Sequence, residues 1–489
     1  MKGRNTMKLK ELLKDVQIIK TNVDLDTQIE SVAYDSRKVT PGCLFVAITG
    51  FVTDGNRFIP MALEKGAAAV VTAVEPQEDI PYVLVPSDRL ALALIGRNLH
   101  GCPADAMKLI GITGTNGKTS STLLLKHILE TVLGAKVGLI GTMENMIGHE
   151  AVPAERTTPE SLDLQALFGQ MRDAGCSHVI MEVSSHAIAL ERVGGITFDV
   201  AAFTNLTEDH LDFHKTMENY CDTKAILFSR CKKAVANRDD AWFDRMCGSA
   251  TCDLLTTSVK TEEGLYAKDL ELLSDGIRFT ANCGGRKAAV NLPIPGKFTV
   301  YNAMTALGCA MQLGISMEDA VKALETAKGV KGRVEVVPTP GKDYTILIDY
   351  AHTPDGLENV LSSVRGFCKG RLISVFGCGG DRDPIKRPIM GRIGVELSDI
   401  AIITSDNPRT EEPMAIIRDI LKGVEDLQKE YIVMENRPAA IRHAMDIAKK
   451  HDIIVLAGKG HETYQEICGV KHHLDEREVV AEYLAETRN

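Results

Sequence analysis

A glycine-rich segment carries the residue types that bind the phosphates of a nucleotide. It runs from Thr113 to Thr119 and lies between an apolar run, 109–112, and a helix-like stretch, 120–133. In that setting backbone N–H groups surround phosphates, a lysine contacts them and a threonine hydroxyl ligates Mg²⁺. The usual spacing needs glycine where Ile112 stands, but the strand, loop and helix context favours ATP over an ordinary turn. The predicted ATP contacts are Gly114, Thr115, Asn116, Gly117, Lys118 and Thr119.

Other reactive side chains follow further apolar runs. Glu182 lies within the run 178–183, and His210 follows the run 198–203. Ligands of parallel sheets bind beyond the carboxyl ends of the strands, so both positions are candidates. Taken alone, Glu182 is more often a solvated strand end and His210 a structural histidine. Lys224 taken alone is a solvent lysine on an amphipathic helix.

The tetrapeptide Asp406-Asn407-Pro408-Arg409 follows the apolar run 400–404. In isolation it is better interpreted as a turn with a surface arginine. Its guanidinium nevertheless offers a bidentate fork that could bind a carboxylate.

The elements that position these residues form an α/β chain. The first hundred residues alternate short β-like runs, such as 43–48 and 68–71, with turn signals. From Lys108, continuous apolar runs alternate with helical stretches, which is typical of a parallel sheet covered on both faces. Proline and glycine concentrate at 338–341, and a second doubly wound unit follows, with strands predicted at 344–348, 372–376, 400–404 and 453–456.

Length and composition agree with a folded, multidomain chain. It has 489 residues, 44% hydrophobic and 25% charged, and a formal net charge of −10. The acidic balance argues against a non-specific nucleic-acid or membrane-surface binder. The twelve cysteines include no Cys-x-x-Cys pair, and no apolar run has the length of a membrane span. We therefore expect reduced thiols in the cytoplasm, no nucleic-acid partner, no membrane insertion, and a monomer.

Several segments of the chain resemble motifs of the Mur ligase family and occur in the same order as in that family. Its variant phosphate loop is 114–119, and the further matching segments are Asp35-Ser36-Arg37, Thr157-Thr158-Pro159, Glu182-Val183-Ser184-Ser185-His186, Asp209-His210-Leu211-Asp212, Asp349-Tyr350-Ala351-His352, Gly377 to Asp383, Asp406 to Arg409, and Gly458 to Glu462. The resemblance covers almost the whole chain. It implies three domains: 1–107, small, α/β and bound to the UDP end of a substrate; 108–336, a central P-loop ATPase with a mainly parallel sheet; and 337–489, Rossmann-like and bound to an amino acid.

The reaction implied by the resemblance is ATP-dependent amide formation in peptidoglycan precursor synthesis. ATP phosphorylates the γ-carboxylate of the D-glutamate in UDP-N-acetylmuramoyl-L-alanyl-D-glutamate, and the amine of meso-diaminopimelate then attacks the acyl phosphate. The pattern Asp406 to Arg409 favours diaminopimelate over lysine, because Arg409 can pair with the extra distal carboxylate.

Residue roles also follow from the resemblance. Mg²⁺ ligands are expected at Thr119, Glu182, His210 and Lys224, the last as a carbamate, and Lys118, Glu182, His210 and Lys224 are the expected catalytic group. Further ATP contacts are expected at Asn302, Arg333 and Asp349. The nucleotide-sugar peptide is expected at Ser36, Thr157, Thr158, Ser184 and Arg192. Diaminopimelate is expected at Arg382, Asp406, Asn407, Pro408, Arg409, Gly458 and Glu462.

Two alternatives remain beside this interpretation. One is a lysine-adding or folylpolyglutamate-type ligase of the same superfamily, which the segment 35–37 and Arg409 disfavour. The other is a P-loop regulatory protein that binds ATP without forming amides. Such a protein would not need the loops 377–383 and 458–462.

Overall fold

The computed structural model describes residues 6–50, 53–154, 156–273 and 275–487. By backbone proximity the chain forms two compact units. The first comprises Met1–Leu265 with Thr305–Ala320, and the second comprises Tyr266–Met304 with Val321–Asn489. Among the described residues, no helix combines the length and apolar character needed to cross a bilayer.

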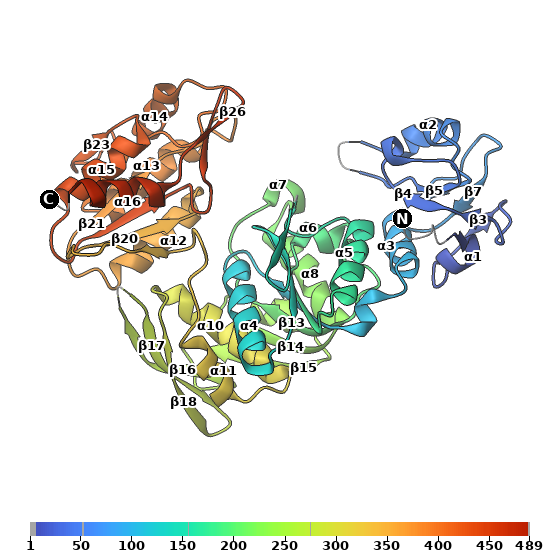
Figure 1. Ribbon diagram of the computed structural model, residues 1–489, viewed down its shortest axis with the longest axis horizontal. Coiled ribbons are helices and arrows are strands. Elements are labelled where there is room, and N and C mark those ends of the chain that lie inside the picture. Colours follow the sequence, from blue (N-terminus) through green and yellow to red (C-terminus); the bar gives the residue numbers. More distant parts are fainter. Residues whose placement is uncertain (1–5, 51–52, 155, 274, 488–489) are drawn as a thin grey trace. The chain divides into compact units, whose positions relative to one another are not determined.

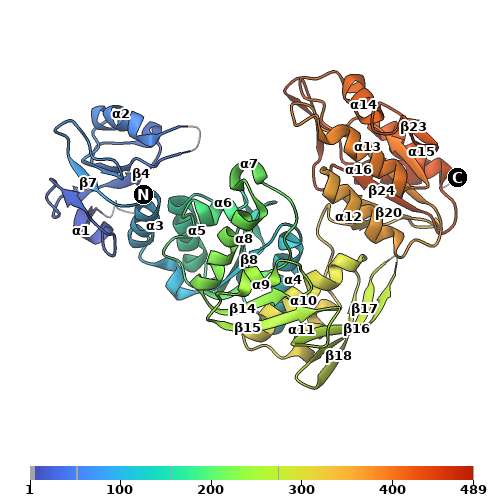
Figure 2. The same cartoon turned by 180° about the vertical axis from the view of Figure 1, so that it is seen from behind.

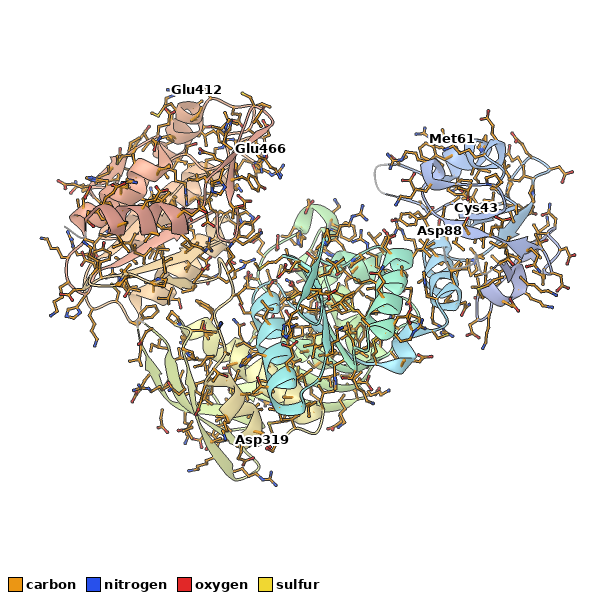
Figure 3. The ribbon with its side chains drawn as sticks, in the orientation of Figure 1. Cys43, Met61, Asp88, Asp319, Glu412 and Glu466 are labelled. Atoms are coloured by element: carbon orange, nitrogen blue, oxygen red, sulfur yellow. The ribbon has the colours of Figure 1, made fainter. Side chains whose placement is uncertain are left out.

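The first unit begins with a small α/β domain (Figure 1). Its main sheet has the strand order β2-β7-β6-β5-β4, with β4 to β7 parallel, and β1 pairs with β3. The strands are β1 (Met7–Lys8), β2 (Lys20–Thr21), β3 (Gln28–Ile29), β4 (Ser31–Ala33), β5 (Cys43–Val46), β6 (Ala69–Thr72) and β7 (Tyr82–Leu84), and the helices are α1 (Leu9–Leu12), α2 (Ile59–Glu64) and α3 (Asp88–Leu99). Asp88, labelled in Figure 3, accepts hydrogen bonds from the N–H and hydroxyl of Thr49 at the start of α3.

A larger parallel sheet forms the rest of the first unit. Its order is β11-β10-β9-β12-β8-β13-β14-β15, parallel from β9 to β15. The strands are β8 (Lys108–Thr113), β9 (Val137–Ile140), β10 (Asn145–Ile147), β11 (Glu150–Val152), β12 (His178–Glu182), β13 (Phe198–Phe203), β14 (Cys231–Asn237) and β15 (Asp253–Ser258). The helices are α4 (Lys118–Leu133), α5 (Ser161–Asp173), α6 (Ser185–Ala189), α7 (Leu211–His214), α8 (Met217–Ala225) and α9 (Phe243–Cys247). Helix α4 follows β8 in the chain and packs against it, and Figure 2 shows α9 next to β14.

The second unit starts with antiparallel strands and ends in a parallel sheet. Strand β17 (Ile277–Cys283) pairs antiparallel with β18 (Arg286–Leu292). Strand β16 (Leu265–Leu272) precedes them in the chain, and α10 (Lys297–Gln312) and α11 (Met317–Leu324) follow. The sheet order after them is β19-β20-β24-β21-β22-β23, in which only the pairing of β19 with β20 is antiparallel.

The elements of this C-terminal sheet alternate along the chain. The strands are β19 (Glu335–Val337), β20 (Thr345–Asp349), β21 (Leu372–Phe376), β22 (Ile400–Ile403), β23 (Tyr431–Val433) and β24 (Ile453–Ala457), with a hairpin of β25 (Tyr464–Ile467) and β26 (Val470–His473). The helices are α12 (Pro354–Arg365), α13 (Lys386–Leu397), α14 (Pro413–Leu421), α15 (Arg437–Ile447) and α16 (Glu476–Glu486). Because strands and helices alternate, each crossover packs a helix on the sheet, as in a doubly wound fold.

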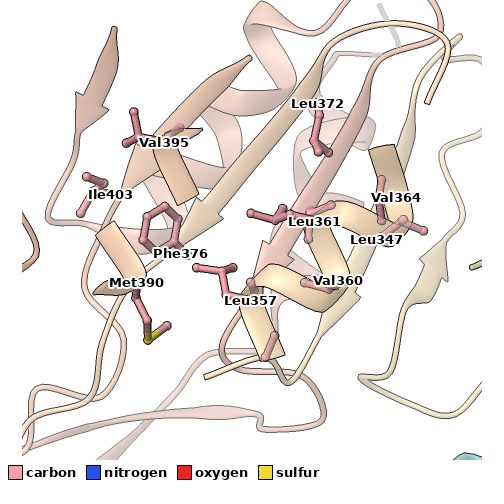
Figure 4. Packing of buried hydrophobic residues seen from close by; sticks show 14 of the residues in the cluster. Leu347, Leu357, Val360, Leu361, Val364, Leu372, Phe376, Met390, Val395 and Ile403 are labelled. Atoms are coloured by element: carbon pink, nitrogen blue, oxygen red, sulfur yellow. The ribbon is translucent and has the colours of Figure 1, made fainter. Parts of the chain in front are cut away.

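The core of the C-terminal sheet shows why the chain folds this way. Leu357 and Leu361 of α12 pack with Phe376 of β21 and Met390 of α13 (Figure 4). Gly394 permits this approach, because a Cβ there would lie 2.2 Å from the Phe376 ring. Burial of a phenylalanine such as Phe376 contributes about 3 to 5 kcal/mol, as judged by the usual cost of truncation to alanine.

The predicted α/β class, with mainly parallel sheets, is confirmed. Strand 372–376 matches β21 residue for residue, and the predicted helix 120–133 begins two residues earlier, at Lys118. The two hairpins β10–β11 and β25–β26 were not predicted. Apart from Asn145, which is buried but polar, their strand residues are partly or fully exposed, so the hairpins carry little of the apolar signal on which strand prediction depends.

Candidate active site

The phosphate loop lies at the carboxyl edge of β8, at the start of α4. Gly114 and Gly117 have positive φ angles of 146° and 82°. A Cβ at Gly114 would lie 1.9 Å from Thr204 Oγ1, so this close approach of two backbone segments requires glycine. Lys118 Nζ donates to the carbonyls of Gly114 and Thr115, at 2.9 and 2.8 Å, which holds its ammonium over the loop.

Glu182 ends β12, next to β8, and contacts the first turn of α4. Its side chain is 1% exposed and accepts hydrogen bonds from the Thr119 hydroxyl (2.9 Å), the Thr142 N–H (3.1 Å) and the Thr142 hydroxyl (3.0 Å). The Thr142 hydroxyl lies 3.1 Å from the Thr157 hydroxyl. Because Thr142 donates its proton to Glu182, Thr157 donates to Thr142, and one chain of hydrogen bonds joins Thr119 to Thr157.

The donor set around Glu182 fits a magnesium ion. The three partners of this buried carboxylate are neutral hydroxyl and amide groups, and a buried carboxylate gains most from a cation. Thr119 and Glu182 supply the hard oxygen ligands that Mg²⁺ prefers. Among the described residues no three His, Cys, Asp or Glu side chains group as a metal site.

Lys224, on α8, lies against the same loop. Its side chain is 2% exposed, and Nζ donates to the Gly114 carbonyl at 3.0 Å, the same oxygen that Lys118 contacts. Burial, and then the charge of Lys118, lower the pKa of Lys224 well below its ordinary value. A buried, readily deprotonated lysine thus lies beside the phosphate loop.

His210 precedes α7 and has a left-handed φ of 54°. Its side chain is about half exposed, and its ring lies 4.8 Å from His186 and 6.3 Å from Tyr220, between centroids. Burial raises the pKa of Tyr220 to about 12. His210 therefore belongs to an aromatic group that also borders Lys224, whose Nζ lies 4.7 Å from the centre of the Tyr220 ring.

Three residues predicted to bind the nucleotide-sugar peptide, Thr158, Ser184 and Arg192, are linked by hydrogen bonds to the backbone carbonyl of Glu182. Thr158 donates its hydroxyl to the Glu182 carbonyl (2.8 Å) and accepts from the Ser184 N–H (3.3 Å). Arg192 donates to the Thr158 carbonyl (3.2 Å). Ser36, by contrast, is buried in the N-terminal domain, where its carbonyl accepts from Lys65.

Arg192 also belongs to a charged cluster. Buried Glu160 lies 3.4 Å from Arg192 Nε, 3.5 Å from Arg89 Nη1 and 3.6 Å from Arg156 Nη1. Burial lowers the pKa of Arg192 despite the attraction of Glu160, and the other two arginines add to this. Three guanidinium groups around one carboxylate leave a surplus of positive charge, which suits an anionic ligand.

The remaining predicted ATP contacts belong to the second unit. Asn302 is buried on α10, and Asp349 ends β20, where it accepts from the Val334 N–H at 2.8 Å. Burial raises the pKa of Asp349, although the neighbouring charge of Arg333 opposes the shift. The Arg333 guanidinium lies 5.2 Å from the centre of the Tyr350 ring.

The predicted amino-acid residues gather at the carboxyl edge of the C-terminal sheet. Loops that follow β21, β22 and β24 carry Arg382, Asp406 to Arg409, and Gly458 to Glu462. Arg409 has a φ of 52° and donates from Nη1 to the Gly380 carbonyl at 2.7 Å. Its Nε lies 3.4 Å from Glu466, which Figure 3 labels.

Within this group exposure differs sharply. Arg382 is exposed and Arg409 partly exposed, whereas Asp406, Asn407 and Pro408 are buried. Asn407 donates from Nδ2 to Glu462 Oε2 at 2.9 Å. Gly458 has a φ of 117°, and a Cβ there would lie 2.4 Å from Asp406 Oδ2, so its contribution is close packing.

Sequence reasoning missed three residues that the structure brings into these clusters: Thr142, Glu160 and Arg89. Thr142 follows β9 at the same sheet edge as the phosphate loop, so the strand-end rule that selected Glu182 could have found it. Glu160 and Arg89 are 71 residues apart in the printed sequence and gave no local signal.

Comparisons with known proteins agree with this architecture. Three family models match the chain in order: "Mur ligase family, catalytic domain" at residues 28–93, "Mur ligase middle domain" at 112–310, and "Mur ligase, glutamate ligase domain" at 332–460.

Full-length relatives are similar to the chain over nearly every residue. A protein of Clostridium tetani named UDP-N-acetylmuramoyl-L-alanyl-D-glutamate–2,6-diaminopimelate ligase is 49% identical over 487 residues, covering 98% of this chain and 100% of the relative. A protein of the same name from Clostridium botulinum is 48% identical over 489 residues, with the same coverage. A solved structure of a ligase with this name matches with a TM-score of 0.75 and 31% identity, covering 99% of this chain and 100% of that one.

Proposed function

Because the chain belongs to the Mur ligase family, we propose that it is the ATP-dependent ligase that joins meso-diaminopimelate to UDP-N-acetylmuramoyl-L-alanyl-D-glutamate. The new amide forms at the γ-carboxylate of D-glutamate, in the synthesis of peptidoglycan precursors. We assign the nucleotide end of that substrate to residues 1–107, ATP to 108–336 and the amino acid to 337–489.

One structural observation gives this proposal its main support. The hydrogen-bond chain from Thr119 through Glu182 and Thr142 to Thr157 joins a nucleotide-phosphate motif to hydroxyls suited to a second, carboxylate-bearing substrate. A protein that only binds ATP needs no such second site. Arg192 and its neighbours add the positive charge that an acceptor carboxylate requires.

The reaction divides into two steps. The γ-carboxylate oxygen attacks the γ-phosphorus of ATP, and the bond to ADP breaks, giving an acyl phosphate. The neutral amine of diaminopimelate then attacks the acyl carbon, phosphate leaves, and the amine loses a proton. Lys118 and the loop N–H groups hold the transferred phosphate, while Thr157, Thr158 and Arg192 orient the acceptor.

Mg²⁺ held by Thr119 and Glu182 would supply positive charge to the phosphate oxygens. We extend the ligand set to His210 and to Lys224 as a carbamate. The lowered pKa of Lys224 supports the second assignment, because only the neutral amine can add carbon dioxide. Its place at the Gly114 carbonyl would put the resulting carboxylate beside the phosphates.

We assign recognition of the third substrate to the C-terminal sheet. Diaminopimelate differs from lysine by a distal carboxylate, and Arg409 offers a bidentate donor for it. Its fixed backbone and its contact with Gly380 preorganise that donor. Arg382, Asn407 and Glu462 complete the set, and Asn302, Arg333 and Asp349 remain our assignments for ATP. The nucleotide substrates and the twelve free cysteines support a cytoplasmic enzyme, and we propose that it is a monomer.

A single assay tests the function. Purified protein is incubated with ATP, Mg²⁺ and the nucleotide dipeptide, and phosphate release and amide product are followed with diaminopimelate, with lysine, or with neither. We expect both signals with diaminopimelate. Amide formation only with lysine would favour a lysine-adding ligase, and phosphate release that is independent of any amine would favour a plain ATPase.

A further inference from the structure

Lys459 is the most completely buried ammonium of the C-terminal sheet. It lies in the loop after β24 and its side chain is 0% exposed. Nζ donates to Asn407 Oδ1 at 2.7 Å, and lies 3.2 Å from Asp406 Oδ1 and 3.4 Å from Glu462 Oε2. Residues that are neighbours at this sheet edge, but about fifty positions apart in the chain, thus share one cation.

This cation fixes the orientation of the Asn407 side chain. The oxygen Oδ1 accepts from Lys459 and from the Glu466 N–H at 2.9 Å, while Nδ2 donates to Glu462 Oε2 at 2.9 Å. An ammonium has only donors, so the atom facing it must be the amide oxygen. The amide nitrogen is thereby directed to Glu462, and both Asn407 and Lys459 donate to the same oxygen of that carboxylate.

The charges explain why a lysine is needed at this position. Burial by itself would raise the pKa of Asp406, but Lys459 and Arg437 outweigh it and hold this pKa below its ordinary value. Arg437 is itself paired with buried Glu476 at 2.8 Å. Asp406 is therefore a charged counter-ion inside the loop cluster, with Gly458 leaving the space for its Oδ2.

We infer that Lys459 is a positioning residue for the third substrate, orienting the Asn407 amide and the Glu462 carboxylate toward the bound amino acid. This inference rests on the proposed function, since both oriented groups belong to the assigned diaminopimelate site. It also separates two roles within that site: Asn407, Glu462 and Arg409 contact the amino acid, whereas Asp406 and Lys459 hold the contacting groups in place.

The test is steady-state kinetics of Lys459→Met with each of the three substrates varied in turn. We expect KM for diaminopimelate to rise about tenfold or more, because an oriented charged hydrogen bond is lost. The KM values for ATP and for the nucleotide dipeptide should change less than about twofold. Lys471→Met is the matched control. The ammonium groups of Lys459 and Lys471 both lie near the Tyr464 ring, 5.9 and 4.1 Å from its centre, but Lys471 is exposed, so the kinetics of its variant should remain those of the wild type.

A second variant keeps the inference testable if Lys459→Met fails to fold. Lys459→Met combined with Asp406→Asn removes one charge of each sign, so the fold should recover thermal stability while KM for diaminopimelate stays raised. In the background of Asn407→Ala, Lys459→Met should raise that KM by a smaller factor than in the wild type, because part of the effect of Lys459 passes through Asn407. Full recovery of KM in the charge-balanced variant, or equal rises for all three substrates, would show a purely structural role.

Failure of the inference is distinguishable from failure of the function. If the wild type forms no amide with diaminopimelate, the proposed function is wrong. If the wild type forms it and folded Lys459→Met binds diaminopimelate as before, only the role of Lys459 is wrong.

Discussion

The phosphate loop and the amino-acid loops occupy equivalent places, at the carboxyl edges of two parallel sheets, yet they are built differently. The first is held mainly by backbone geometry and hydroxyl groups, from Gly114 to Thr119 and Glu182. The second is held by buried ions, with Lys459 and Asp406 at its centre. A phosphate is bound well by N–H groups and one lysine, whereas a zwitterionic amino acid needs charges of both signs at fixed separations.

Each of the two regions also contains a buried lysine, and the surroundings of these two lysines differ. Near the phosphate loop, Lys224 is buried against a carbonyl, and its pKa is lowered by burial and by the charge of Lys118. In the C-terminal sheet, Lys459 is equally buried but lies beside two carboxylates, which compensate its charge. A buried lysine thus lies near another cation in one region and near two anions in the other.

The largest effect should come from breaking the backbone geometry of the phosphate loop. In Gly114→Ala the new Cβ would overlap Thr204, so the loop must move, and we expect kcat/KM for ATP to fall about a thousandfold or more. The measurement is phosphate release at varied ATP.

Gly134→Ala is the control for this prediction. Gly134 also has a positive φ, of 59°, at the other end of α4, but nothing lies within 4 Å of its added Cβ. It should cost about 1 kcal/mol of unfolding free energy and leave activity intact. Equal activities of the two alanine variants would contradict our account of the loop.

A smaller effect is expected from removing the charged fork of the second region. In Arg409→Ala, kcat/KM for diaminopimelate should fall about a hundredfold, because a desolvated carboxylate loses its bidentate partner. The value for lysine, which has no distal carboxylate, should change much less. The ratio of the two rates is the measurement, and Arg418→Ala, an exposed arginine paired with Glu412, is the control. An unchanged ratio would place the distal carboxylate elsewhere.

The smallest effect concerns pH. Burial first, and then the charge of His186, lower the pKa of His214 to about 4. The unfolded chain takes up this proton near the ordinary pKa of 6.5, before the folded chain does, so the unfolding free energy should decrease as the pH falls from 6.5 to 4. We expect a loss on the order of 1 kcal/mol.

Urea unfolding at several pH values measures this loss, and His214→Gln should remove it. The variant can keep a hydrogen bond to the Ser185 hydroxyl, which lies 2.8 Å from His214 Nε2. A pH dependence that is identical in the variant and the wild type would show that other groups cause it.

The phosphate loop and the C-terminal loops also differ in how much of each could be predicted from the sequence. The phosphate loop is one continuous segment whose function depends on local backbone conformation, and its residues lie where the motif predicts. Thr142 was missed because a single threonine after a strand is common, and only its contact with Glu182 distinguishes it. Glu160 was missed because two of its three arginine neighbours, Arg89 and Arg192, come from remote segments of the chain.

The loops of the proposed amino-acid site were predicted from the sequence. The different contacts that the residues of these loops make were not. Sequence motifs selected Asp406, Asn407 and Arg409 together, as if all three faced a ligand. Their contacts distinguish them, since Asp406 pairs with buried Lys459, Asn407 donates to Glu462, and Arg409 is partly exposed.

The sequence by itself determined the α/β class, the parallel sheets, the phosphate loop and the family, because these depend on periodic apolar residues and on short continuous motifs. Only the tertiary structure decided which polar groups are buried and which of them share a partner. Burial and pairing depend on distances between segments remote in the chain, and these set the protonation of Lys224 and the orientation of Asn407. Local spacing carries no information about such distances, so the chemistry of the two lysines became distinct only in the folded chain.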